Sequence, residues 1–287
     1  MPNATHHHPH DHHDDEDHHR GLAFDVGTVM ARRRALQLLG GAGLLALVGC
    51  GSSGSDGATT TSAAAGSTTA AGASSSTSSA AGSTIPQETA GPYPGDGSNG
   101  PDALSQSGIV RRDITSSFGG ATGTADGVPL AISLVVTDAA TGKARSGAAV
   151  YAWHCDREGW YSMYSAGVED QNYLRGVQET GSDGTATFDS TFPGAYAGRW
   201  PHVHFEVYES VEAATGGGDP IATSQIALPQ ATCEEVYATS GYEASQGNLA
   251  GVSLQTDMVF ADSYQQETGT VTGSVDDGLA VSLPVPV

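Results

Sequence analysis

Alternating hydrophobic and polar positions recur through the second half of the chain and predict short β-strands. Residues 130–137 (LAISLVVT) and 202–208 (HVHFEVY) have the period of two that a half-buried strand requires. Residues 148–153, 185–188 and 279–287 are three further expected strands, separated by turns such as residues 182–184 (SDG). No long amphipathic helix is predicted, and residues 234–239 form at most a short one. The pattern indicates an all-β domain, either a sandwich or a barrel.

The first 31 residues lack any such pattern. Eight of the 11 histidines lie in the first 20 residues, interrupted by Pro and Asp. Clustered histidines can bind metal loosely, but a segment without a hydrophobic period cannot offset the entropy lost when its backbone becomes ordered. We therefore expect residues 1–31 to be a disordered leader.

Residues 32–50 are typical of an export signal. Arg32, Arg33 and Arg34 precede an apolar stretch at residues 36–48, which is shorter than the roughly 20 residues that span a bilayer as a helix. The paired arginines resemble a twin-arginine signal, and residues 47–50 (LVGC) resemble a lipobox, in which Cys50 receives lipid. Residues 51–84, almost all Gly, Ser, Thr and Ala, are expected to form a flexible linker. We expect an exported bacterial domain that is lipid-anchored on the outer face of the cytoplasmic membrane.

Residues 85–287 are enough for one domain with its own core. They carry seven basic and 25 acidic residues, a net charge of −18 within a chain total of −21. We therefore expect no nucleic-acid binding, and membrane contact through the lipid anchor only. Three cysteines are too few for a disulfide scaffold. With Cys50 lipidated, Cys155 and Cys233 are left either as one disulfide or as two separate buried thiols.

The candidate chemistry centres on two histidines in the strand expected at residues 202–208. Side chains at positions i and i+2 of a strand point to one face, about 6.6–7 Å apart. His202 and His204 can therefore bind one metal ion, while Val203 and Phe205 pack in the core. An HxH pair alone also occurs in cupins, copper proteins and ordinary cores. No carboxylate stands between the histidines, which argues against a two-His-one-carboxylate ferrous site.

Two tyrosine-containing segments lie upstream of this pair. They are residues 159–162 (GWYS) and 193–199 (PGAYAGR). Phenolates are hard anionic oxygen donors that ionise near pH 10 on their own, but a bound trivalent cation would deprotonate them. Two tyrosinates and two neutral imidazoles suit Fe(III).

These motifs resemble those of the intradiol ring-cleavage dioxygenases, the non-haem ferric enzymes that open catechols between the two hydroxyl groups. The resemblance covers nearly all of residues 85–287, is greatest to the exported, lipoprotein-type branch of the family, and implies a prealbumin-like β-sandwich. The matching segments, in the order of the family, are residues 85–94 (IPQETAGPYP), 111–114 (RRDI), 129–130 (PL), 152–156 (AWHCD), 159–162, 174–178 (LRGVQ), 192–199 (FPGAYAGR) and 202–204 (HVH).

The resemblance also implies roles for single residues. Arg199 would face the substrate and stabilise developing negative charge, because a guanidinium is always protonated. Gln225 matches the family's active-site glutamine, and Pro92 and Tyr93 would line the substrate pocket. His154 would be structural and not a ligand. The implied iron ligands are Tyr161, Tyr196, His202 and His204.

The implied reaction inserts both atoms of O₂ between the hydroxyl-bearing carbons of a catechol-type substrate and gives a cis,cis-muconate-type product. Tyr196 would leave the iron and accept one catechol proton while a hydroxide accepts the other, so no net charge is added to a dry pocket. The alternative is a non-catalytic, surface-tethered β-sandwich that binds phenolics or iron, because a fold does not fix a function. The sequence does not distinguish among catechols, nor a monomer from a homodimer.

Overall fold

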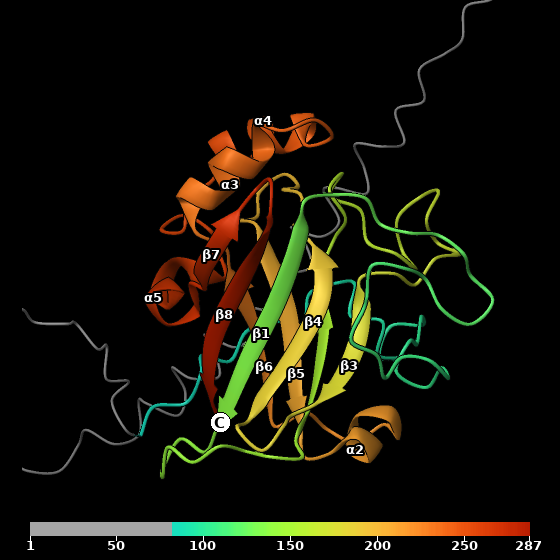
Figure 1. Ribbon diagram of the computed structural model, residues 1–287, viewed down its shortest axis with the longest axis vertical. Helices are drawn as coiled ribbons and strands as arrows, with labels where there is room; N and C mark the ends of the chain where they lie inside the picture. The colour runs from blue at the N-terminus through green and yellow to red at the C-terminus, as the bar shows by residue number, and fades with distance from the viewer. Residues whose placement is uncertain (1–81) are drawn as a thin grey trace, which may run out of the picture.

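Two four-stranded β-sheets form the framework of the protein in the computed structural model, which describes residues 82–287 (Figure 1). One sheet has the strand order β4-β1-β8-β7 and the other β3-β2-β5-β6, and all neighbouring strands are antiparallel except β1 and β8. The predicted all-β sandwich is confirmed. The strands are β1 (Pro129–Thr137), β2 (Ala149–Trp153), β3 (Arg175–Glu179), β4 (Thr185–Thr191), β5 (His202–Tyr208), β6 (Ala222–Ala227), β7 (Thr270–Ser274) and β8 (Gly278–Pro286).

All five strands expected from the alternation are present. The bounds of β1, β2, β5 and β8 agree with the predictions to within one residue, and β4 continues three residues further, to Thr191. β3, β6 and β7 were missed. β6 (ATSQIA) is buried at every position and β7 (TVTGS) at none, so neither has the alternation that marks a half-buried strand.

The helices are short and lie at the margins of the sandwich. They are α2 (Val211–Thr215), α3 (Gln230–Tyr237), α4 (Glu243–Ala250), the 3₁₀ helix η1 (Phe260–Asp262) and α5 (Tyr264–Glu267). The pair α3 and α4 lies at one end of the sandwich and α2 at the other (Figure 1). The short helix expected at residues 234–239 corresponds to the second half of α3. No helix in residues 82–287 is long and apolar enough to cross a membrane.

The two sheets differ in how much of their surface is covered. Along β1, buried positions alternate with partly exposed ones, whereas β2 and β5 are buried at every residue. Val203 and Phe205 of β5 pack in the core between the sheets, as predicted. The opposite face of this sheet is covered by a second apolar cluster, to which Trp153 of β2 and Ile109 of a long loop belong. Side chains on that covered face are therefore also removed from water.

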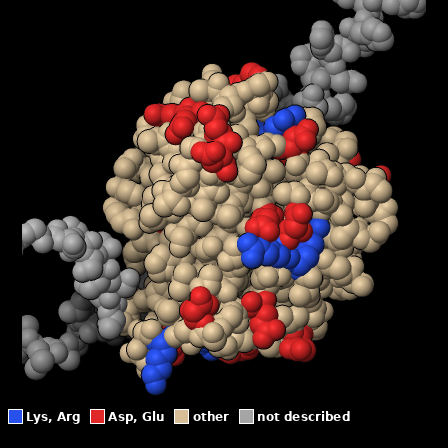
Figure 2. All heavy atoms as spheres, in the orientation of Figure 1, with Lys and Arg blue, Asp and Glu red and all other residues tan. Residues whose placement is uncertain are grey.

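Acidic side chains lie in several patches on the face drawn in Figure 2, with fewer basic ones among them. This distribution agrees with the excess of 25 acidic over seven basic residues after residue 84. The predicted leader, the export signal with Cys50, and the linker up to residue 81 lie outside the described residues.

Candidate metal centre

Two histidines and two tyrosines from three segments meet on the covered face of the β3-β2-β5-β6 sheet. His202 and His204 lie on β5, Tyr161 on the loop after β2, and Tyr196 on the loop before β5. Each of the four is at most 5% exposed. The structure therefore brings together the four side chains that the resemblance implied as iron ligands.

The donor atoms of these side chains surround Nε2 of His202. This atom lies 3.0 Å from Nε2 of His204, 3.3 Å from Oη of Tyr196 and 3.5 Å from Oη of Tyr161. Two donors that each bind a metal ion at about 2.1 Å, at angles near 90–110°, are roughly 3.0–3.4 Å apart. The observed separations therefore fit several donors around one ion.

The two imidazoles are held in place in different ways. Nδ1 of His202 lies 2.5 Å from the carbonyl oxygen of Trp200, which places the N–H on Nδ1 and leaves the lone pair of Nε2 facing the other donors. His204 instead stacks on Trp153, with ring centroids 4.9 Å apart and 4° between the planes. Within residues 82–287, Nδ1 of His204 has no hydrogen-bond partner.

Burial sets the protonation of the donors. It lowers the pKa of His202 to about 3, with the nearby charge of Arg199 acting in the same direction, and it lowers the pKa of His204 well below 6.5. Both imidazoles are thus neutral, the form that binds metals. Burial, together with the adjacent Tyr196, raises the pKa of Tyr161 well above 10. Its phenol therefore becomes a donor anion only beside a strong positive charge.

The chemistry of this donor set fits a hard trivalent ion. In the part of the chain that the structure describes, no group of three or more His, Cys, Asp or Glu side chains could hold a metal ion. The converging donors are two imidazoles and two phenols. Phenolates are hard anionic oxygen donors, and two of them neutralise most of the charge of Fe(III).

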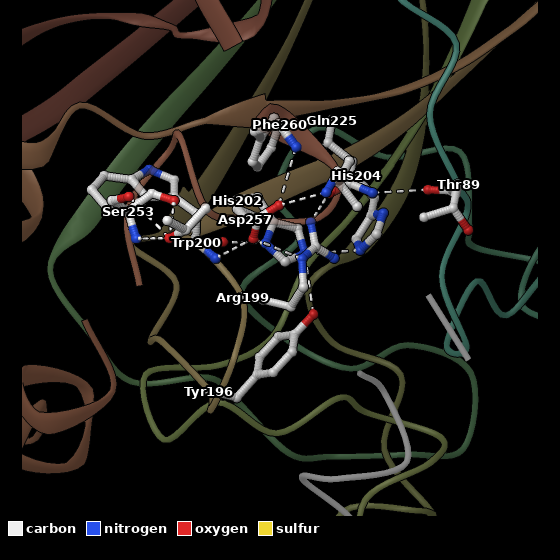
Figure 3. Close-up of polar contacts among 12 residues, drawn as sticks. Thr89, Tyr196, Arg199, Trp200, His202, His204, Gln225, Ser253, Asp257 and Phe260 are labelled. Carbon is white, nitrogen blue, oxygen red and sulfur yellow. Dashed lines mark hydrogen bonds and ion pairs between the residues drawn. The ribbon is translucent and has the colours of Figure 1, made fainter. Parts of the chain in front are cut away.

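Arg199 lies beside these donors and is joined to two other buried side chains (Figure 3). Its Nη2 donates to Oε1 of Gln225 at 2.7 Å, and its Nε donates to Oδ2 of Asp257 at 3.0 Å. Gln225 is paired with His204 across β5 and β6. Burial alone would raise the pKa of Asp257, but the charge of Arg199 and the hydrogen bonds donated to the carboxylate hold it below its ordinary value.

The predicted pocket segment reaches the same site. The ring of Tyr93 lies 4.9 Å from that of Tyr161 by centroids, and the carbonyl of Pro92 accepts a hydrogen bond from Asn99. Nε2 of Gln225 donates to the carbonyl of Thr89 at 2.9 Å. The segment that carries Pro92 and Tyr93 is thus bound both to a candidate ligand and to the glutamine beside Arg199.

Two buried residues near the site were not predicted from the sequence. Asp257 belongs to no motif and lies 58 residues after Arg199, so only folding brings the two together. Arg175 lies in a family-like segment, but the resemblance implies no role for it. It donates to the carbonyl of Pro94, to Oη of Tyr151, and to both the carbonyl and Oγ of Ser162, and within residues 82–287 no carboxylate pairs with it. It joins the pocket segment to the loop of Tyr161.

His154, Cys155 and Cys233 lie outside the set of candidate ligands. The ring of His154 faces Oγ of Ser190 and the carbonyl of Cys155, both at 2.7 Å, and none of the candidate ligands. Of the two alternatives for Cys155 and Cys233, the structure has two separate buried thiols and no disulfide between them. Each sulfur instead faces a backbone carbonyl, that of Gly194 or that of Leu228.

Comparison with solved structures gives the class of fold. An intradiol ring-cleavage dioxygenase from Tetranychus urticae is 26% identical over 62% of this chain and 86% of its own, with a TM-score of 0.53. A second dioxygenase crystal structure is 24% identical over 62% of this chain and 85% of its own, with a TM-score of 0.52. No protein-family model and no curated protein matches the sequence. The chain has the fold of the intradiol ring-cleavage dioxygenases, which confirms the resemblance to this family seen in its motifs. The likeness to the exported, lipoprotein-type branch stays a prediction.

Proposed function

We propose that the protein is a non-haem Fe(III) intradiol dioxygenase. It would insert O₂ between the hydroxyl-bearing carbons of a catechol-type aromatic and give a cis,cis-muconate-type product. The observation that carries this proposal is the convergence of Tyr161, Tyr196 and His204 on Nε2 of His202, within 3.0–3.5 Å and beside the buried Arg199. The similar fold of the Tetranychus urticae enzyme supports it.

Each of the four ligands and the residues around them would have a distinct role in the reaction. Held by these four side chains, Fe(III) would supply Lewis acidity that activates the catechol ring toward O₂. Tyr196 would accept one of the two catechol protons and a hydroxide would accept the other, while Tyr161 would remain a phenolate. His202, held by the carbonyl of Trp200, keeps its lone pair directed at the centre. Because all four side chains are buried, bulk water is kept from the reacting atoms.

Arg199 and Gln225 would stabilise charge that develops on the substrate oxygens. Arg199 can do so without changing its protonation state, and a preoriented donor costs no reorganisation during the reaction. Gln225 holds Arg199 on one side and the Thr89 carbonyl on the other, so it also fixes the pocket segment. Tyr93, whose ring lies tilted against that of Tyr161, would form one wall for the aromatic ring of the substrate.

The same proposal includes export. Residues 32–50 support it through their paired arginines, their short apolar stretch and Cys50. A chain lipidated at Cys50 stays in the membrane fraction, and Cys50→Ser would release it. The catalytic domain would then act outside the cytoplasmic membrane on catechol-type compounds.

The competing function is a non-catalytic binding module for phenolics or iron. It would have the same strands, but it would have no use for a buried arginine and glutamine beside the four donors. The test is O₂ uptake by the iron-loaded protein with catechol. Uptake with formation of a muconate supports the dioxygenase. Iron or catechol binding without uptake would instead favour the binding module.

A further inference from the structure

The Arg199 guanidinium is fixed by a carboxylate that lies far from it in the sequence. Arg199 and Asp257 form an ion pair of 3.0 Å, and both side chains have no exposed surface. Few ion pairs in proteins are this deeply buried, because both charges lose their hydration. A pair in such a position has to be held by further contacts.

Asp257 is itself held rigidly by backbone N–H groups. Its Oδ2 accepts from the N–H of Trp200 at 2.7 Å as well as from Arg199. Its Oδ1 accepts from the N–H groups of Val259 at 2.8 Å and Phe260 at 3.1 Å. Each carboxylate oxygen thus receives two hydrogen bonds, so the carboxylate has one orientation and presents Oδ2 to Arg199.

The opposite side of the guanidinium is fixed as well. Its Nη2 donates to Gln225, and its central carbon lies 5.8 Å from the ring centroid of Phe260. That ring also lies 6.2 Å from the ring of His202. Asp257 and Gln225 therefore hold the guanidinium from two directions, next to a candidate iron ligand (Figure 3).

We propose that Asp257 is a positioning residue for catalysis: it holds Arg199 in the orientation in which the guanidinium stabilises charge on the substrate. This inference rests on the proposed function, because it assigns Asp257 a part in that reaction. The carboxylate of Asp257 also compensates the charge of Arg199 inside a buried site, so that the arginine stays oriented before the substrate arrives.

Asp257→Asn tests the proposal with an almost unchanged side-chain shape. If the amide oxygen keeps the bonds to Val259 and Phe260, the NH₂ group faces two donors, Nε–H of Arg199 and N–H of Trp200. The guanidinium then loses its partner. In the iron-loaded full-length protein we expect kcat with catechol to fall on the order of 10–100-fold. The tyrosinate-to-iron absorption band should stay, because the four ligands are untouched.

A double-mutant cycle separates positioning from general structural support. If Asp257 acts through Arg199, then Asp257→Asn combined with Arg199→Met gives the same kcat per bound iron as Arg199→Met alone. Losses that multiply would overturn the proposal. Glu267→Gln is the matched control: this fully buried carboxylate accepts from Ser224 and Ser263 and does not contact Arg199. It should leave kcat unchanged.

A second measurement does not depend on activity. In ¹⁵N NMR spectra of the wild-type chain, the Nε–H of Arg199, assigned by its loss in Arg199→Met, should exchange with water far more slowly than that of the exposed Arg112. Asp257→Asn should abolish this protection. Equal exchange of Arg199 and Arg112 in the wild type would overturn the proposal even if Asp257→Asn fails to fold. A different result would be a wild-type protein that protects the Nε–H of Arg199 from exchange and yet takes up no O₂ with catechol. That result would contradict the proposed dioxygenase function, but not the hold of Asp257 on Arg199.

Discussion

The indole of Trp153 and the imidazole of His204 lie face to face, with 4.9 Å between ring centroids and 4° between planes. The two residues are paired across β2 and β5, so the stack is built into the sheet. Within residues 82–287, neither Nδ1 of His204 nor Nε1 of Trp153 has a hydrogen-bond partner. The orientation of His204 therefore depends on stacking, whereas that of His202 depends on a backbone carbonyl.

Trp153→Leu should weaken iron binding by about 10-fold or more, because groups that orient a metal ligand contribute that much to affinity. Competition with an iron chelator measures the change. Phe188→Leu, in the core between the sheets, is the control, and it should lower the unfolding temperature without changing iron affinity. Unchanged affinity in Trp153→Leu would mean that the stack has no part in holding His204.

Tyr161→Phe should reduce the colour of the iron-loaded protein, whereas His154→Ala should leave it unchanged. The first removes a phenolate donor, so the visible tyrosinate-to-iron band of the iron-loaded protein should bleach. The second removes a ring that faces Ser190 and no candidate ligand, so the band should remain. His154→Ala should still reduce the free energy of unfolding by about 1–3 kcal/mol, because it leaves the buried Ser190 without this partner. Absorption spectra and thermal melts of both variants check these outcomes.

Arg175→Met should strongly destabilise the fold. The substitution leaves the buried carbonyl of Ser162 without its donor, which costs about 1–3 kcal/mol, and removes one of the two donors to the carbonyl of Pro94. Arg112→Met is the comparison, because its ion pair with Asp189 is exposed and should contribute little to stability. Urea denaturation of both variants measures the difference. Similar losses of stability in the two variants would show that Arg175 does not hold the pocket segment against the loop of Tyr161.

Glu267 makes stability depend on pH. Burial raises its pKa from 4.5 to about 7, although hydrogen bonds from Ser263 and Ser224 oppose the shift. Between those two values the folded state binds more protons than the unfolded state, so the free energy of unfolding falls as pH rises from about 4.5 to 7. Glu267→Gln mimics the protonated form and should flatten part of this decline, by roughly 1–3 kcal/mol at pH 7. Denaturation at pH 5 and pH 7 provides the test. A slope identical to that of the wild type would contradict the assignment to Glu267.

The sandwich could be predicted because its half-buried strands alternate. β1 and β5 were found almost residue for residue, since one face of each carries the core residues of the sandwich. β6 and β7 could not be found in this way. Their pairing partners, β5 and β8, determine that they are strands, and this information is absent from their own short segments.

The candidate site, like the set of strands, could be predicted from the sequence only in part. The HxH pair has a spacing that strand geometry explains, and the tyrosines and Arg199 lie in family-like motifs. Asp257 could not be predicted, because its role arises from one contact across 58 residues and from three backbone donors. For Cys155 and Cys233 the sequence left a disulfide and two separate thiols open, and only the fold, in which each thiol is buried separately, decides between them.

The most direct test of the central claim is the fate of labelled oxygen. The iron-loaded protein is incubated with catechol under ¹⁸O₂, and the ring-opened product is analysed by mass spectrometry. The account predicts one O₂ consumed per catechol and a cis,cis-muconate that carries label in both new carboxyl groups. A protein that binds four-coordinate iron but yields no ring-opened product, or a product without the label, would contradict it.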